Sequence, residues 1–293
     1  MLIIGSRGSQ LALWQAHFIA GQLSQMGVAS RIEIIKTTGD HMQTASLTQS
    51  GGKGLFTKEI EEALLRGQID LAVHSLKDLP TESPVGLTIA AVPLRANPFD
   101  AIAGSRLADL PAGALVGTSS PRRSEQLRLL RPDLKFAPIR GNVDTRLRKL
   151  HSGEFNAILL AAAGLERLGL QQEIAEVFAP DQLCPAPGQG ALGIQTRVAD
   201  RAEVICARLN HEATSQAVRA ERAVLAGLGG GCQLPIGAFA LVTDDILALS
   251  AVVVVTDSAV AMKANMKGAP SDAEKLGRSL AADLLSQGAA CIL

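Results

Sequence analysis

A single cysteine lies in a loop that allows close backbone approach. Cys232 follows the three glycines at 229–231, and Pro235 comes soon after it. Helix and strand interiors do not accommodate such a run, so we expect a loop between a helix over about 212–225 and a β-rich segment. The thiol is either an incidental surface group or a point of attachment, and the rest of the chain must decide between these two.

A carboxylate with a lysine beside it is the second candidate for chemistry. Lys77 and Asp78 follow the apolar run 69–73, which is typical of a buried strand. A carboxylate just beyond a strand end can act as a general acid or base, and the alternative is a surface Lys–Asp pair. His74 interrupts the apolar run, and we expect it to be a core residue.

Two arginines begin a predicted helix at the end where cations are disfavoured. Ser120 suits the N-cap and Pro121 the first helical position, so Arg122 and Arg123 fall in the first turn. The helix dipole is already positive there. Two guanidinium groups, unsatisfied backbone N–H groups and three hydroxyls therefore predict that an anion docks at this terminus. The hydroxyls are those of Thr118, Ser119 and Ser120.

Other basic residues also follow predicted strands. Arg7 comes after the strand at 2–5 and Arg140 after the strand at 135–137, while Arg146 lies in the first turns of the next helix. Between 122 and 149 there are nine basic and three acidic residues, so nucleic acid is a competing partner. Only one aromatic residue lies in this stretch and several cations sit at strand ends, which favours a cleft for a small polyanion.

The elements that position these residues alternate between strand and helix, which predicts α/β lobes. The first helix, about 11–26, is expected to place Leu11, Trp14 and Phe18 on one face. The polar segment 38–56 holds Lys53 among glycines, and is either a cation-bearing lid or a plain surface loop. Gly188, Gly190 and Gly193 form a G-x-G-x-x-G pattern that begins in the linker at 184–190. No strand precedes it, so we interpret it as a hinge rather than a dinucleotide site.

Composition bounds the remaining possibilities. The chain has 293 residues, enough for two or three domains, and 28 basic residues balance 28 acidic ones. Bulk charge therefore indicates neither a nucleic-acid nor a membrane partner. The four cysteines show no metal-ligand or disulfide spacing, so no metal is expected. The longest apolar runs are too short to span a bilayer, and we expect a cytoplasmic protein.

Seven segments, in order, resemble the porphobilinogen deaminase (hydroxymethylbilane synthase) family over nearly the whole chain. They lie at 5–15, 51–56, 73–80, 117–123, 140–143, 187–190 and 230–235. The resemblance implies an α/β fold of three domains: two lobes with mixed sheets, like type II periplasmic binding proteins, and a small α+β C-terminal domain. We place the first domain at 1–94 and 190–207, the second at 95–189, and the third at 210–293.

The resemblance also implies the chemistry. The family's cysteine forms a thioether to a dipyrromethane cofactor, and this position is Cys232 here. Four porphobilinogens are then joined head to tail with loss of ammonia, and water releases the linear tetrapyrrole. Asp78 matches the catalytic aspartate, which is expected to protonate the leaving amine and to take the final α-proton. A monomer is expected.

Each pyrrole bears an acetate and a propionate, and arginine forks suit such carboxylates. The residues expected at the cofactor, besides Cys232, are Ser75, Lys77, Asp78, Thr118, Ser119, Ser120, Arg122, Arg123, Arg140 and Gly141. Those expected at the substrate are Arg7, Ser9, Gln15, Lys53, Arg146 and Gln189. One difference from relatives is the apolar start, 2–4, where they often carry a basic residue, so one anion contact is expected to be absent.

A non-enzymatic module for a small polycarboxylate is the alternative, because a binding lobe would share the fold. Such a module has no use for both Asp78 and a glycine-flanked cysteine. A covalent adduct on Cys232 separates the two hypotheses.

Overall fold

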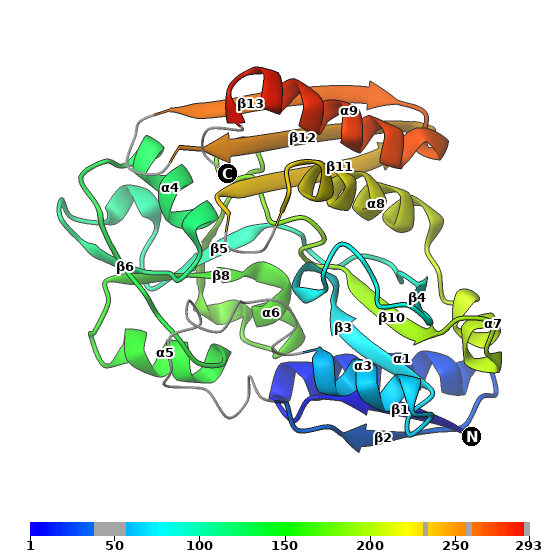
Figure 1. Ribbon diagram of the computed structural model, residues 1–293. Helices are drawn as coiled ribbons and strands as arrows, with labels where there is room; N and C mark the ends of the chain where they lie inside the picture. Colours follow the sequence, from blue (N-terminus) through cyan, green and yellow to red (C-terminus); the bar gives the residue numbers. More distant parts are fainter. Residues whose placement is uncertain (38–56, 231–233, 256–259, 290–293) are drawn as a thin grey trace. The chain divides into compact units, whose positions relative to one another are not determined.

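The computed structural model describes residues 1–37, 57–230, 234–255 and 260–289. Two compact units are present (Figure 1). The first comprises residues 1–95 and 191–215, and the second comprises residues 96–190 and 216–293. The chain therefore passes from the first unit to the second, returns to the first at residue 191, and enters the second again at residue 216.

The first unit is built on a five-stranded mixed sheet of order β2-β1-β3-β10-β4. Its strands are β1 (Leu2–Ser6), β2 (Ser30–Ile34), β3 (Leu71–Ser75), β4 (Leu87–Ala91) and β10 (Leu192–Arg197). β1 is parallel to both β2 and β3, whereas β10 runs antiparallel to β3 and β4. The carboxyl ends of β1 and β3 therefore meet at one edge of the sheet.

Within the described residues of this unit, the helices beside the sheet are α1 (Gln10–Gln25), α3 (Lys58–Leu65) and α7 (Arg201–Ala207). α1 begins at Ser9, whose Oγ accepts a hydrogen bond from the Ala12 amide at 3.3 Å. Its buried side is formed by Gln15, Ala16, Ile19 and Leu23. Trp14 and Phe18 lie on one face of the helix, as predicted, and stack on each other, but this face is exposed, at 36% and 39% for the two side chains.

The second unit contains a sheet with the same plan, of order β7-β6-β8-β5-β9. Its strands are β5 (Asp100–Ala103), β6 (Leu115–Gly117), β7 (Lys135–Ala137), β8 (Ala157–Ala161) and β9 (Ile174–Val177). β6 is parallel to β7 and β8, and β5 is antiparallel to β8 and β9. Three helices follow the parallel strands: α4 (Pro121–Leu130), α5 (Val143–His151) and α6 (Ala162–Arg167). Their N-termini lie at the carboxyl edge of this sheet.

A three-stranded antiparallel sheet and a long helix complete the second unit. The strands are β11 (Ile236–Thr243), β12 (Ile246–Val254) and β13 (Ala261–Gly268). α8 (Glu212–Gly227) leads into this region and α9 (Ala273–Ser286) closes it. Val224 of α8, Leu249 of β12 and Leu280 of α9 share one apolar core.

The other side of this sheet packs within the same unit. Cys184, Val252 and Val254 form a buried cluster, and the rings of Phe99 and Phe239 lie 5.4 Å apart. These contacts explain why 216–293 groups with 96–190. The predicted α/β fold, with two mixed-sheet lobes and a small α+β C-terminal part, is confirmed. The proposed boundaries of three separate domains stay a prediction.

Candidate functional site

In the first unit, the predicted residues gather where β1 and β3 end. Arg7 directly follows β1, and Ser75 is the last residue of β3. A single 3₁₀ turn, Leu76–Asp78, follows β3. The side chain of Leu76 is buried, Lys77 is half-buried and Asp78 is exposed. The buried leucine thus anchors a turn that presents the carboxylate to its surroundings.

Helix α1 supplies two further predicted residues to this unit, and both already have partners. The amide of Gln15 is buried and donates to the Ser75 hydroxyl at 2.8 Å. The Ser9 hydroxyl caps α1, as described above. The structure therefore joins Gln15 and Ser75, while the substrate-binding roles of Ser9 and Gln15 stay predictions.

His74 lies in this unit one position before Ser75. It is only 7% exposed, as expected for a core residue. Burial lowers the pKa of its imidazole to about 4, against a pull upward from the Gln195 side chain and with a further lowering by the charge of Arg7. His74 is therefore neutral near pH 7, and it adds no charge beside Arg7.

In the second unit, hydrogen-bond donors face the edge where β6 and β8 end. Thr118 is buried and its Oγ1 accepts from the Ser120 amide at 3.2 Å, while the Ser119 hydroxyl donates to the Ile139 carbonyl at 2.8 Å. Ser120 occupies the predicted N-cap of α4, but its side chain makes no cap hydrogen bond. Asn142 at the N-cap of α5 makes none either. The first-turn amides of α5 can therefore donate to an anion, whereas α4 begins with Pro121, which has no N–H, and its Arg123 amide already donates to the Ser120 carbonyl at 3.0 Å.

Arg140, Gly141 and Arg146 form a tight turn before and within α5. Gly141 has a φ of +109°, and a Cβ on it would come within 2.7 Å of the Thr145 side chain. This backbone brings the Gly141 carbonyl to the Nε of Arg146, at 2.8 Å. Arg140 is exposed and Arg146 is half-buried. The glycine is thus needed for the turn that carries both cations.

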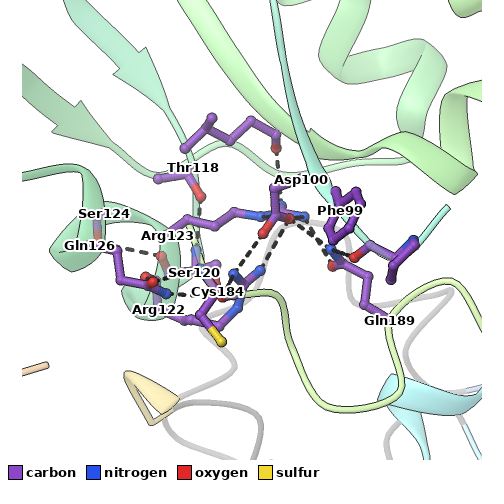
Figure 2. A network of polar contacts seen from close by, with 12 residues as sticks. Phe99, Asp100, Thr118, Ser120, Arg122, Arg123, Ser124, Gln126, Cys184 and Gln189 are labelled. Carbon is purple, nitrogen blue, oxygen red and sulfur yellow. Dashed lines mark hydrogen bonds and ion pairs between the residues drawn. The ribbon is translucent and has the colours of Figure 1, made fainter. Parts of the chain in front are cut away.

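Arg122 and Arg123 are at the predicted place on α4, but they are buried, at 4% and 7% exposure. Figure 2 shows that both point at the carboxylate of Asp100. Arg122 binds it through Nη1 and Nη2, at 2.6 and 3.1 Å, and Arg123 through Nε at 2.8 Å. The anion at this helix end is therefore an internal carboxylate. Contacts of these arginines to a cofactor stay a prediction.

The pKa values follow from this arrangement. Burial alone would raise the pKa of Asp100, but the charges of Arg122 and Arg123 outweigh it and hold that pKa well below its usual range. Burial and the charge of Arg122 lower the pKa of Arg123, and the Asp100 carboxylate opposes this. The Asp100 carboxylate is therefore ionised near pH 7, and with two guanidinium groups the cluster of Asp100, Arg122 and Arg123 carries one net positive charge.

The linker at 184–190 is tied into this cluster. Gln189 is 1% exposed, and its amide donates to Asp100 at 3.0 Å and to the Pro98 carbonyl at 2.8 Å. The Cys184 carbonyl accepts from Arg122 at 2.7 Å and from Gln126 at 3.1 Å. Gln189 therefore supports the cluster, and a substrate contact of Gln189 stays a prediction.

Two predicted residues, Lys53 and Cys232, lie outside the described residues. Sequence reasoning missed Asp100, although a carboxylate at the start of an apolar run was a usable signal. Within the described ranges, no group of three or more His, Cys, Asp or Glu side chains could hold a metal ion. The same part of the chain has no helix long and apolar enough to cross a membrane.

The donor set at these edges fits an acidic oligopyrrole. The second unit offers hydroxyls, two helix N-termini without side-chain caps, and guanidinium groups at one sheet edge. Such groups donate hydrogen bonds to carboxylates, and arginine does so in a bidentate manner. The first unit, taken by itself, has Arg7, Lys77 and one exposed carboxylate, Asp78, at its own sheet edge. Such cations suit a ligand with many carboxylates, and a carboxyl group of this kind can transfer a proton.

The fold and these edges define a two-lobed α/β enzyme with a small additional C-terminal region. Family models match both parts. "Porphobilinogen deaminase, dipyromethane cofactor binding domain" matches residues 2–204, and "Porphobilinogen deaminase, C-terminal domain" matches 215–286. The chain belongs to the porphobilinogen deaminase family.

Curated relatives agree over nearly the full length. A porphobilinogen deaminase of Acidothermus cellulolyticus is 51% identical, over 99% of this chain and 90% of that protein. One of Geotalea daltonii is 49% identical, over 100% and 93%, and one of Chromobacterium violaceum is 48% identical, over 98% and 95%. Among solved structures, a periplasmic substrate-binding protein from Coxiella burnetii is 14% identical with a TM-score of 0.44, over 71% of this chain and 92% of that chain.

Porphobilinogen deaminase is hydroxymethylbilane synthase, a transferase of tetrapyrrole biosynthesis. It joins four porphobilinogen molecules head to tail on a bound dipyrromethane, with loss of ammonia, and releases hydroxymethylbilane by hydrolysis. The family match supports this activity for the chain over a non-enzymatic polycarboxylate-binding module. Dipyrromethane is accordingly its cofactor.

Proposed function

We propose that Cys232 carries the dipyrromethane and that Asp78 moves the protons of the reaction. The position of Asp78 carries this proposal: it is an exposed carboxylate on a turn fixed by buried Leu76, at the edge that Arg7 shares. When bound, the dipyrromethane supplies the pyrrole carbon onto which the first substrate is added.

Asp78 has two tasks in this proposal. In its acid form it donates a proton to the amino group of porphobilinogen, so that the C–N bond breaks and ammonia leaves. After the new C–C bond has formed, the resulting carboxylate accepts the proton lost from the pyrrole α-carbon. Each cycle therefore returns Asp78 to its acid form, and the two proton transfers balance.

The cations hold the acetates and propionates while this happens. Arg7 and Lys77 serve the first unit's edge, and Arg140 and Arg146 serve that of the second, together with the hydroxyls of 118–120. The proposed set of carboxylate-binding residues also includes Lys53, Gln189, Arg122 and Arg123. Orientation of a reacting centre by remote binding groups lowers the barrier without a further catalytic group.

Intact-mass measurement and steady-state rates test the proposal together. Wild type should carry an adduct of two pyrrole units, and Cys232→Ser should carry none and have no activity. Cys206→Ser is the matched control, since that thiol is buried in the first unit's core and should leave the adduct in place.

Asp78→Asn should retain the adduct and lose about 10²–10⁴-fold in kcat, the usual worth of a positioned acid or base. Asp109→Asn is its control, because Asp109 is an exposed aspartate that ends a 3₁₀ turn of the other unit. A Cys232→Ser protein that still carries the adduct would refute the attachment point. Full activity in Asp78→Asn would refute the proton-transfer role.

We propose a cytoplasmic monomer that binds no nucleic acid. Light scattering coupled to size exclusion should give about the 30.5 kDa of one chain. The division into three domains is part of the same proposal, and limited proteolysis near 208–210 would test its last boundary.

A further inference from the structure

We propose that Asp100 is a positioning residue for this reaction: it fixes the two α4 guanidiniums at the sheet edge where the cofactor's carboxylates bind. The inference rests on the proposed function, because that function puts the carboxylates at this edge. Asp100 acts through Arg122 and Arg123, and it touches neither substrate nor cofactor.

The topology brings Asp100 to this edge. It is the first residue of β5, which runs antiparallel to β8, and it pairs with Ala161 at the carboxyl end of β8. β6 is parallel to β8, so α4, which follows β6, starts at the same edge. A residue at the beginning of an antiparallel strand thereby meets residues at the beginning of a helix 22 positions later.

One buried carboxylate organises both guanidinium planes. The side chain of Asp100 is 0% exposed. Arg122 grips both of its oxygens, and Arg123 approaches one of them through Nε and Nη2, at 2.8 and 2.7 Å (Figure 2). The Gln189 amide donates to that same oxygen. The arginines also donate to backbone carbonyls, Arg122 to that of Cys184 and Arg123 to that of Leu159. Neither guanidinium can therefore rotate without losing several charge-assisted hydrogen bonds.

The charge balance argues against a purely structural ion pair. A single arginine would neutralise Asp100, and burying a second guanidinium costs desolvation that the first pair does not require. The second positive charge has a use if the site must attract an acidic ligand that is not part of the folded chain. Asp100 then offsets the repulsion between two like charges that lie side by side, and leaves one net positive charge for that ligand.

A positioning role of Asp100 and a purely electrostatic effect of its charge predict opposite changes in ligand binding, so a substitution can distinguish them. Asp100→Asn removes a negative charge, so a purely electrostatic site would bind a polycarboxylate more tightly. If Asp100 positions the arginines, the same variant binds it less tightly. Asp100→Glu keeps the charge but moves the carboxylate by one methylene group, so only the positioning role predicts a defect.

The experiment compares proteins purified in parallel from the same host. Intact mass gives the fraction of chains that carry the two-pyrrole adduct, and steady-state rates give kcat and KM per loaded chain. Asp100→Asn is expected to lower the loaded fraction and to raise KM for porphobilinogen by at least about tenfold, with kcat per loaded chain changed less than about threefold. Asp100→Glu is also expected to lower the loaded fraction and to raise KM.

Asp133→Asn is the matched control. Asp133 pairs with Arg131 in the same unit, at 2.8 and 2.7 Å, but on the exposed surface. The Asp133→Asn variant has the same change in charge, and its loaded fraction and its KM for porphobilinogen should equal those of wild type. If Asp100→Asn does not fold, Asp100→Glu decides. If neither folds, Gln189→Met decides: it removes the amide that donates to Asp100 and to the Pro98 carbonyl, and it should lower the loaded fraction, a readout that a contact of Gln189 to the substrate would not change.

Wild-type loading and KM in folded Asp100→Asn and Asp100→Glu proteins would overturn the inference and leave the proposed function intact. Tighter binding in Asp100→Asn with normal Asp100→Glu would also overturn it, in favour of charge alone. An absence of adduct from wild type would instead overturn the proposed function, and this inference with it.

Discussion

The buried imidazole of His74 should make the protein lose stability as the pH falls below neutral. His74 is 7% exposed, and burial, the first cause, lowers its pKa from 6.5 to about 4. In the unfolded chain the imidazole is solvated and has its ordinary pKa. Between these two values the unfolded state binds a proton that the folded state does not, so the free energy of unfolding rises with pH across this window.

The size of the effect follows from the two pKa values. The whole difference, at 1.36 kcal/mol per pKa unit, is about 3 kcal/mol. Most of this loss of stability occurs above pH 5, where few carboxylates titrate. Between pH 7 and pH 5, the contribution of His74 is a loss of about 2 kcal/mol in the free energy of unfolding.

Urea unfolding of wild type and His74→Gln at pH 7, 6 and 5 measures this contribution. Glutamine keeps a polar side chain of similar length but binds no proton in this range. The variant should therefore lose about 2 kcal/mol less than wild type between pH 7 and pH 5. His17→Gln, at an exposed position of α1, should retain the wild-type pH dependence.

The comparison depends on the difference between pH values, so a uniform destabilisation of His74→Gln does not affect it. An equal loss of stability in the variant and wild type would refute the reasoning. A measured imidazole pKa near 6.5 for His74 in the folded protein, from an NMR titration, would refute it directly.

Two other substitutions have predictable effects on thermal unfolding. Gly190→Ala should cost at least about 2 kcal/mol, because φ is +82° there and the new Cβ would lie 2.7 Å from the Ala96 carbonyl. Gly21→Ala, in α1 with no atom within 4 Å of the new Cβ, should instead stabilise by about 0.5–1 kcal/mol, and a loss there would contradict this reasoning. Glu221 is wholly buried and its carboxylate accepts from the amides of Gly188 and Ala240, at 2.7 and 2.8 Å. Glu221→Gln should cost about 1–3 kcal/mol, since its NH₂ group would face one of these N–H donors, and unchanged stability would count against that account.

Cations at strand ends could be predicted from the sequence because the signal is local. An apolar run marks a strand, the residue after it lies at the sheet edge, and parallel strands bring such residues to one edge. Arg7, Arg122 and Arg140 were placed in this way, and the structure puts each where its strand or helix requires. The roles of these residues toward the cofactor came from the family resemblance, and they remain to be tested.

The partner of the arginine pair could not be predicted in the same way. Asp100 reaches Arg122 only because β5 enters the sheet antiparallel beside β8, and that placement depends on the whole sheet. The sequence pattern indicated an anion at the start of α4 but could not distinguish an internal carboxylate from an external one.

The sequence pattern placed Leu11, Trp14 and Phe18 on one face of α1 but did not show which face of the helix packs on the sheet. The helix approaches its sheet through the small Ala16 together with Ile19 and Leu23, so the larger Trp14 and Phe18 are left outside, where they stack. Burial of Gln15 was not evident either, because it depends on a hydrogen bond to Ser75, 60 residues away.

The strand order has a consequence for synthesis on the ribosome. Among the described strands, β4 pairs with β10 alone, which is made about a hundred residues later, whereas all five strands of the other sheet emerge between 100 and 177. During translation the sheet of β5–β9 can thus be completed first. The sheet of the first unit still lacks β10, so the edge of β3 that pairs with β10 is open until then. A nascent chain that stalls before residue 192 would display that open edge, and a chaperone that recognises unpaired strands would have its binding site there.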